Sequence, residues 1–437
     1  MSCLPAEADP GARRRTLPRM LSDSAASPGD TPARRDTATP APPHPEVAAL
    51  VAGGTPDAEA VGAFVAGHRF PLVEPGRATF AWFGEAERVE LLRWIHAGVD
   101  RTPLAPLPGT RLWLGEVPVE DGGRFEYKLS VTRDGHEEWI LDPLNRQTAE
   151  DPFGSNSVCR THGYERPAWT EPQGAPKGRL VPLAVDSEVF GERREELLYL
   201  PAGRVPGEPL ALLVVHDGRD FDHFADLSTC LDNLIHSGDV PPVVAALIQA
   251  GDRMEEYPRG RRHARYVVDE LLPAIEAVEA IDPEPARRVI LGASLGAVAS
   301  LATLLRRPGA FGGAVLQSGT FVLDERRLAG REHPVYARAA RLMRALRRAP
   351  SLPAARIHVS TGELEGLAKE SRALAELLDE RGVEVRFESS WDGHHWHNWR
   401  DGLRDALTWT LGRDRTRRVR AWEPGPTTTE GGGDDDG

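Results

Sequence analysis

The 437-residue chain has little cysteine and no long apolar run. Its three cysteines, Cys3, Cys159 and Cys230, are odd in number and widely spaced, which excludes a disulfide framework or a zinc cluster and predicts a reducing, cytoplasmic setting. Since no apolar run approaches the roughly 18 residues that cross a bilayer, a membrane-spanning protein is excluded. With Lys+Arg 53 against Asp+Glu 66 and a formal net charge of -13, nucleic acid and anionic membranes are disfavoured as partners.

The two ends of the chain also lack apolar periodicity. Residues 1–44 are rich in Pro, Ala, Arg and Ser, and we expect them to form a disordered leader because nothing in them offsets the entropy cost of ordering. No apolar stretch of 7 to 15 residues follows the early arginines, so secretion is not expected. Residues 413–437 are predicted to be a disordered acidic tail.

The length predicts two or three domains, and the first has the pattern of antiparallel strands. Two short helical stretches are expected first, in PEVAALVAGG and PDAEAVGAFVAGH. From about 78 to 142, short β-rich runs alternate with turn sequences such as LPGT and EDGG, which predicts a β-sandwich domain over residues 45–165. The segment DPLNRQTAEDPFGSNSV is rich in Asp, Asn and Pro and is expected to be a loop.

The second half has a different pattern, in which continuous apolar runs alternate with helical segments. Such runs are typical of strands that helices bury on both faces. We therefore predict an α/β domain with a doubly wound, mostly parallel sheet over residues 175–412. The expected strands are ALLVVHDG, PPVVAALIQAG, RRVILGAS, GGAVLQSG, ARIHVSTG and VEVRFESSWDG.

A candidate nucleophile follows one of these strands, in RRVILGASLGAVASLATLLRR. Gly292 and Gly296 flank Ser294 at the turn between the predicted strand and the next helix. Small residues are needed there because a strained turn exposes the serine hydroxyl and the helix must pack closely on the strand. The alternative is a glycine-rich turn whose serine merely caps the helix.

An acid and a base for this serine follow later strands, in the order that the predicted fold requires. Glu363 and Glu365 come after ARIHVSTG, and spacing alone does not choose between them. His394, His395 and His397 come after the last strand, at the same carboxyl edge of the sheet. The alternatives are histidines of a surface loop or a fortuitous metal patch, and we predict no metal because well-placed carboxylates or cysteines are lacking.

Two backbone donors for a developing oxyanion are expected at the same edge. The amide of Leu295 is one, and the other is expected at Gly218 or Arg219, in ALLVVHDGRDF. Alternatively, the HDG sequence is only a turn. Arg253 is a candidate for substrate binding, although arginines on such loops are more often solvated or paired to a nearby Glu.

Several longer segments carry a family resemblance. They are AFVAGHRFPLVEPGRATFAWFG, TPLAPLPGTRLW, DPLNRQTAEDPFGSNSV, VVHDGRDF, LGASLGAVAS and GHHWHNWRDGL. Over roughly residues 46 to 412 the chain resembles the enterochelin esterase family, cytoplasmic siderophore esterases among the esterase D-like α/β-hydrolases. The resemblance places the triad at Ser294, Glu365 and His394. The sequence departs from the family in having Asp-Gly-His-His where Gly-Gly-His-Asp is usual.

The resemblance implies an α/β-hydrolase fold preceded by an early-set immunoglobulin-like sandwich that helps to enclose a ferric siderophore. It further implies a serine esterase that needs no cofactor and hydrolyses the lactone esters of a catecholate siderophore, releasing iron in the cytoplasm. Two alternatives stay open: a general esterase D-type carboxylesterase or acyltransferase, and a non-catalytic glycan-binding protein. The oligomeric state is left open as well.

Overall fold

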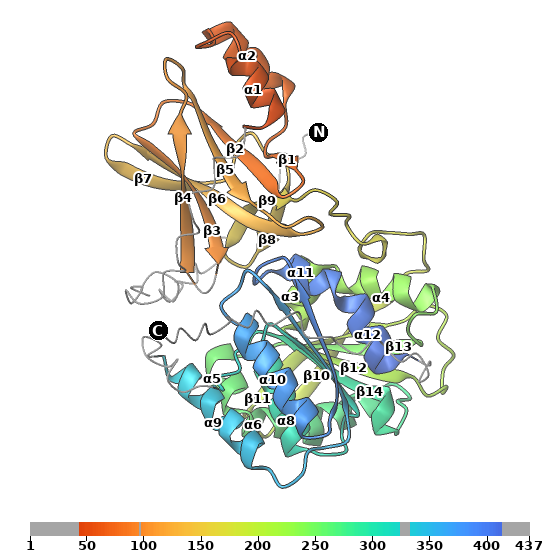
Figure 1. The fold of residues 1–437 in the computed structure, drawn as a ribbon. Helices are drawn as coiled ribbons and strands as arrows, with labels where there is room; N and C mark the ends of the chain where they lie inside the picture. Colours follow the sequence, from red (N-terminus) through yellow and green to blue (C-terminus); the bar gives the residue numbers. More distant parts are fainter. Residues whose placement is uncertain (1–42, 96–97, 324–332, 413–437) are drawn as a thin grey trace, which may run out of the picture.

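The computed structural model describes residues 43–95, 98–323 and 333–412. The predicted acidic tail lies outside the described residues, and so does the predicted leader except for its last two residues. Two regions follow one another along the chain, an N-terminal region (residues 43–160) and an α/β region (residues 179–412), which lie against each other in Figure 1.

The N-terminal region contains two helices and an antiparallel sheet that has nine strands among the described residues. The strand order is β1-β2-β5-β4-β3-β6-β9-β8, and β7 pairs with β6. The elements are α1 (Pro45–Val51), α2 (Ala58–Gly67), β1 (Leu72–Glu74), β2 (Arg77–Phe83), β3 (Arg88–Ile95), β4 (Gly98–Pro106), β5 (Leu112–Pro118), β6 (Arg124–Arg133), β7 (His136–Ile140), β8 (Thr148–Asp151) and β9 (Gly154–Arg160).

Alternation of side chains builds the core of this region. Along β6, Phe125, Tyr127, Leu129 and Val131 all belong to one buried cluster, as expected for a strand whose successive side chains point to opposite faces. The helices α1 and α2 pack over a second, smaller cluster that includes Phe64. Both predicted helices and the antiparallel pairing are confirmed.

The expectation of a loop over DPLNRQTAEDPFGSNSV is wrong in its second half. Residues 148–160 form the hairpin β8–β9, and β9 also pairs with β6. The side chain of Asp151 accepts a hydrogen bond from the amide of Phe153 at 2.6 Å, and Gly154 has a φ of 121°. The same Asp and Gly that suggest a loop therefore form a tight hairpin turn here.

The α/β region has eight strands in its described part, in the order β10-β11-β13-β12-β14-β15-β16-β17. The six strands β12 to β17 pair in parallel, whereas β10 and β11 form an antiparallel edge next to β13. The strands are β10 (Arg179–Ser187), β11 (Glu192–Leu200), β12 (Ala211–His216), β13 (Val243–Ile248), β14 (Arg288–Ala293), β15 (Gly313–Gln317), β16 (Arg356–Gly362) and β17 (Glu384–Ser390). The α/β class and the six predicted strands are confirmed.

Two apolar cores, one on each face, bury this sheet. Side chains of α7, α8, α9 and α10 contribute to one core and those of α3, α4 and α12 to the other. The helices and helical turns are η1 (Ala168–Thr170), α3 (Gly218–Ala225), α4 (Leu227–His236), α5 (Arg253–Arg259), α6 (Arg261–Arg265), η2 (Tyr266–Leu271), α7 (Leu272–Glu276), η3 (Pro285–Arg287), α8 (Leu295–Arg306), α9 (Pro334–Arg348), α10 (Ala368–Glu380), α11 (Trp396–Asp401) and α12 (Leu403–Leu411). None of the described helices is long and apolar enough to cross a membrane.

Candidate active site

Ser294 lies at the junction of β14 and α8 in a strained backbone conformation. Its φ is 56° and its ψ is -119°, a combination that non-glycine residues adopt rarely and that costs about 1–3 kcal/mol. Its side chain makes no capping hydrogen bond, which argues against a purely capping serine. The residues on both sides are buried, whereas Ser294 itself is partly exposed. The turn thus presents the hydroxyl at the carboxyl edge of the sheet.

The two flanking glycines allow this turn because the helix and the strand touch there. A Cβ at position 292 would lie 2.3 Å from the carbonyl carbon and oxygen of Gly296, closer than any side chain can approach. A Cβ at position 296 would lie 3.1 Å from Cβ of His216. The close packing predicted from the small residues is confirmed.

Glu365 and His394 are brought together from the loops after β16 and β17. Oε2 of Glu365 is in direct hydrogen-bonding contact with Nδ1 of His394. The Glu365 side chain is 2% exposed and that of His394 is 36% exposed, so one is enclosed and the other reaches the site. A donor at Nδ1 leaves Nε2 of the neutral imidazole free to accept a proton.

Three further hydrogen bonds hold the Glu365 carboxylate. Oε1 accepts from the hydroxyl of Thr361 at 2.7 Å and from the amide of Gly362 at 2.8 Å, and Ser318 bonds the same carboxyl group. Burial alone would raise the pKa of Glu365, but the charge of His394 and these hydrogen bonds hold it below its usual value. The carboxylate is therefore ionised at neutral pH and oriented toward the imidazole.

Ser318 connects this pair to the strand beside the nucleophile. It follows β15 with a φ of 49°, and its hydroxyl oxygen accepts a hydrogen bond from Nε1 of Trp399 at 2.9 Å. The Trp399 ring in turn stands perpendicular to the His394 ring, with centroids 5.0 Å apart. One residue earlier, the carbonyl of Gln317 accepts from the amide of Ser294 at 2.9 Å.

The other sequence candidates for acid and base lie elsewhere. Glu363 accepts a hydrogen bond from Ser389 at 2.7 Å, in an exposed position. His395 lies 3.3 Å from Glu126 of the N-terminal region, and burial lowers the pKa of its imidazole. Burial also lowers the pKa of His397, to about 3. Among residues 43–95, 98–323 and 333–412, no group of three or more His, Cys, Asp or Glu side chains could hold a metal ion.

The expected oxyanion donors begin two helices at the same edge. Leu295 is the first residue of α8, and Gly218 and Arg219 are the first two of α3. Amides in the first turn of a helix have no acceptor within the helix and can donate to a ligand. Only glycine fits at 218, since a Cβ there would lie 2.3 Å from Cα of Leu247. The Arg219 side chain is engaged with the carbonyl of Glu195 at 2.7 Å.

Arg253 is paired with Asp217, the residue directly before Gly218, rather than with a glutamate. Its Nε donates to both carboxylate oxygens of Asp217, at 3.0 and 2.9 Å. Asp217 has a φ of 53°, and its amide donates to the Tyr257 hydroxyl at 3.1 Å. These contacts fix the turn that precedes Gly218 and leave the Arg253 side chain 37% exposed.

A buried pair of histidines, His216 and His263, lies next to the turn formed by Asp217 and Gly218. Nε2 of His216 lies 2.9 Å from Nε2 of His263, and Nδ1 of His216 lies 2.9 Å from the hydroxyl of Ser300 in α8. Because Ser300 donates to the carbonyl of Gly296, its oxygen must accept from Nδ1 of His216, so that His263 donates to His216. Burial lowers the pKa of His216 to about 4 and that of His263 well below its usual value, and both rings are neutral at neutral pH.

The sequence analysis did not identify the residues that hold Glu365 or those that hold the turn before Gly218. Thr361 and Ser318 hold Glu365, Asp217 holds Arg253, and Tyr257 holds the amide of Asp217. Thr361 is the only one with a local signal, because it lies four residues before the carboxylate that it contacts. The others come from separate strands and helices.

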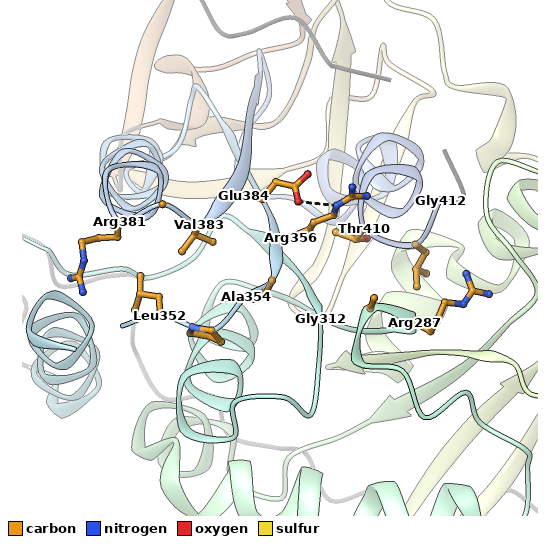
Figure 2. Close-up of a pocket in the computed structure, with 15 residues that line it drawn as sticks. Arg287, Gly312, Leu352, Ala354, Arg356, Arg381, Val383, Glu384, Thr410 and Gly412 are labelled. Carbon is orange, nitrogen blue, oxygen red and sulfur yellow. Dashed lines mark hydrogen bonds and ion pairs between the residues drawn. The ribbon is translucent and has the colours of Figure 1, made fainter. Parts of the chain in front are cut away.

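A separate hollow of about 690 Å³ lies at the opposite edge of the sheet, where β15, β16 and β17 begin. Figure 2 shows its lining, including the ion pair between Arg356 and Glu384. Arg381 donates to backbone carbonyls of the α9 end, and Arg287 lies 3.6 Å from Asp282. Each charged side chain of its lining thus already has a partner, and none of the candidate residues above lines the hollow.

Among known proteins, a family model first matches the α/β region of the chain. The model of the Esterase family, described as "Putative esterase", matches residues 187–410. The iron(III) enterobactin esterase of Dickeya dadantii is 27% identical over 304 residues, which cover 57% of this chain and 68% of that protein. The protein of the same name from Escherichia coli K12 is 29% identical over 187 residues, 42% of this chain and less than half, 46%, of its own length.

Solved structures extend the likeness across both regions. The ferric enterobactin esterase of Salmonella typhimurium aligns with a TM-score of 0.65 at 23% identity, covering 76% of this chain and 93% of that one. The enterobactin esterase of Shigella flexneri in the presence of enterobactin aligns with a TM-score of 0.63 at 23% identity, covering 76% and 92%. At these identities the structures establish a shared fold. The resemblance to enterochelin esterases is confirmed.

Proposed function

Because the chain belongs to the Esterase family and is a carboxylic ester hydrolase, we propose that it cleaves its ester through an acyl-enzyme on Ser294. The observation that carries this proposal is the contact of buried Glu365 with His394, at the same sheet edge as the strained Ser294. A serine hydroxyl needs such a base to act as a nucleophile at neutral pH.

In the proposed mechanism, Oγ of Ser294 attacks the ester carbonyl while Nε2 of His394 takes the hydroxyl proton. The amide of Leu295, with that of Gly218 or Arg219, donates to the oxyanion that forms. His394 then gives its proton to the departing alkoxide, which leaves as an alcohol. A water molecule then attacks the acyl-serine while the same imidazole takes its proton. The imidazolium gives that proton to Oγ of Ser294 as the acyl–oxygen bond breaks, which releases the carboxylic acid and restores the serine. Glu365 holds the histidine tautomer and stabilises the imidazolium.

We propose that the ester is a lactone bond of a catecholate siderophore, in which case hydrolysis releases the iron that the siderophore carries. The sequence likeness to iron(III) enterobactin esterases supports this substrate class.

We further propose an α/β-hydrolase fold for residues 175–412 and an immunoglobulin-like sandwich for residues 45–165. Cys159 and Cys230 are free and buried, which supports an assignment to the reducing cytoplasm.

A substrate panel tests the proposal. Purified protein is offered a catecholate trilactone with and without iron, short p-nitrophenyl esters and α-glucans, and kcat/KM is measured for hydrolysis. We expect the trilactone to have the highest kcat/KM. Equal kcat/KM for the trilactone and the small esters would favour a general carboxylesterase. Binding of α-glucans without hydrolysis of any ester would favour a glycan-binding protein.

A further inference from the structure

The loop that carries His394 is hydrogen-bonded to the beginning of strand β6 in the N-terminal region. Nη1 of Arg124, the first residue of β6, donates to Oδ2 of Asp392 at 2.7 Å. Its Nη2 donates to Glu126 at 2.9 Å, and its backbone amide donates to the carbonyl of Trp391 at 3.1 Å. The side chains of Arg124, Asp392 and Glu126 are at most 4% exposed, so these charges have little access to water.

Apolar packing joins the same loop to the N-terminal core. The Trp391 ring meets the Phe125 ring edge to face, with centroids 5.8 Å apart. A Cβ on Gly123 would lie 2.5 Å from the Trp391 carbonyl oxygen, which shows how closely the two backbones approach. Leu364, the neighbour of Glu365, packs against the same core cluster. The loops of the acid and of the base are thus both anchored in the N-terminal region.

A second polar contact lies on the other side of His394. Nδ1 of His395 is 3.3 Å from Oε2 of Glu126, which also accepts a hydrogen bond from Asn156 of β9 at 2.9 Å. Burial would raise the pKa of Glu126, but His395 and Arg124 lower it to about 2, so the carboxylate is ionised. The residue directly after His394 and the residue two before it therefore both pair with β6.

These contacts add to the hydrogen bonds that the α/β region itself makes with the loop. Residues 391–395 lie between β17 and α11 and form neither helix nor strand. Within the α/β region, the carbonyl of Asp392 accepts from the amide of Leu364 at 3.0 Å, that of Gly393 from Asn398 at 2.9 Å and that of His395 from the amide of Trp399 at 3.2 Å. The amide of Asp392 also donates to the carbonyl of Ser390 at 2.8 Å. The buried side chains of β6 add further contacts to this loop.

We propose that Arg124 and Glu126 are positioning residues that hold the imidazole of His394 against Glu365, so that the N-terminal region completes the acid–base part of the site. The inference rests on the proposed function of His394. Burial already raises the pKa of Asp392 to about 7, so without Arg124 this carboxyl would be protonated, and Glu126 would lose its bonded cation. The loop would then lose the ionic contact that holds Asp392 to β6. A displacement of about 1 Å at a catalytic group is enough to lower a rate on the order of 100-fold.

The test compares Arg124→Met with Arg124→Lys and with Arg101→Met. Arg101 lies on β4 of the same sheet and pairs with Glu90 and Glu137, so its replacement also removes ion pairs but none that reach the α/β region. With a small p-nitrophenyl ester, we expect Arg124→Met to lower kcat roughly 10- to 100-fold with less than about a threefold change in KM. Arg124→Lys should recover part of kcat, and Arg101→Met should match the wild type.

A second readout does not depend on any ester. The proton on Nδ1 of His394 gives a low-field NMR resonance, assigned by its loss in a His394→Asn variant. We expect this resonance in the wild type and in Arg101→Met, and its loss or displacement in Arg124→Met. If the wild type hydrolyses no ester, the proposed function fails while this resonance still tests the positioning role.

Unchanged kcat and an unchanged resonance in Arg124→Met would overturn the inference. If that variant does not fold, Glu126→Gln replaces it, because the amide keeps the size of the side chain and removes the charge that faces His395. An unchanged kcat and resonance in a folded Glu126→Gln protein would then overturn it equally.

Discussion

The proposed nucleophile and the proposed acid–base pair are held in different ways. Ser294 is fixed by its own strand–turn–helix segment and by the neighbouring strand, all within the α/β region. In the loop of His394, by contrast, Asp392 is bonded by Arg124, which lies 268 positions earlier in the chain. Local backbone geometry thus sets one part of the site, and packing between distant segments sets the other.

The largest expected effect comes from breaking the nucleophile part. Ser294→Ala removes the attacking oxygen, so kcat should fall on the order of 10⁴-fold or more. Because the Ser294 side chain makes no capping hydrogen bond, the Tm should remain close to that of the wild type. Steady-state kinetics and thermal unfolding check both statements, and a variant that keeps more than a tenth of wild-type kcat would place the nucleophile elsewhere.

A smaller loss is expected from the acid. Glu365→Gln removes the charge that stabilises the His394 imidazolium and should lower kcat on the order of 10³-fold. Glu363→Gln is the matched control, because Glu363 bonds only the exposed Ser389 among the hydrogen bonds described for its side chain. A greater loss in the Glu363 variant would reverse the assignment. A loss below tenfold in both variants would indicate a serine–histidine dyad.

The pH dependence of stability tests the buried, neutral state of His216, which contacts Ser300 of α8. The pKa of His216 is lowered by burial to about 4, so between about pH 6.5 and 4 the unfolded chain binds a proton that the folded protein does not. This group alone should lower the free energy of unfolding by about 1.4 kcal/mol for each pH unit in that window as the pH falls. Urea unfolding at pH 7 and 5 should show a shallower loss in His216→Leu, and an equal or steeper loss would contradict the buried neutral histidine.

The smallest expected effect sharpens the comparison at the junction of the two regions. A Cβ on Gly123 would meet the carbonyl of Trp391, so Gly123→Ala should shift the His394 loop and lower kcat by roughly tenfold. Gly62→Ala is the control in the same region, since a Cβ there has no atom within 4 Å. Equal kcat values for the two variants would show that the loop does not depend on this contact.

The sequence predicts the locally formed parts of the molecule better than the contacts between distant segments. The strand–turn–helix segment of Ser294 was predictable because its strand, small residues and helix are contiguous. Most of the parallel strands were predictable because they are continuous apolar runs. Spacing alone did not choose Glu365 over Glu363, and only the family resemblance favoured Glu365, because the choice depends on which side chain the fold turns toward His394. The hairpin β8–β9 was missed because Asp, Asn and Gly mark loops and tight turns alike. The pairing of Arg124 with Asp392 leaves no local pattern in the sequence.

The covalent intermediate tests the central claim most directly. The protein is mixed with an excess of ester, quenched in acid within the first turnovers, digested and examined by mass spectrometry. We predict that the peptide containing Ser294 carries the added mass of the acyl group, that the adduct accumulates further in Glu365→Gln if deacylation slows more than acylation, and that it is absent in Ser294→Ala. Hydrolysis without any adduct at Ser294, or with the adduct on another residue, would contradict the account.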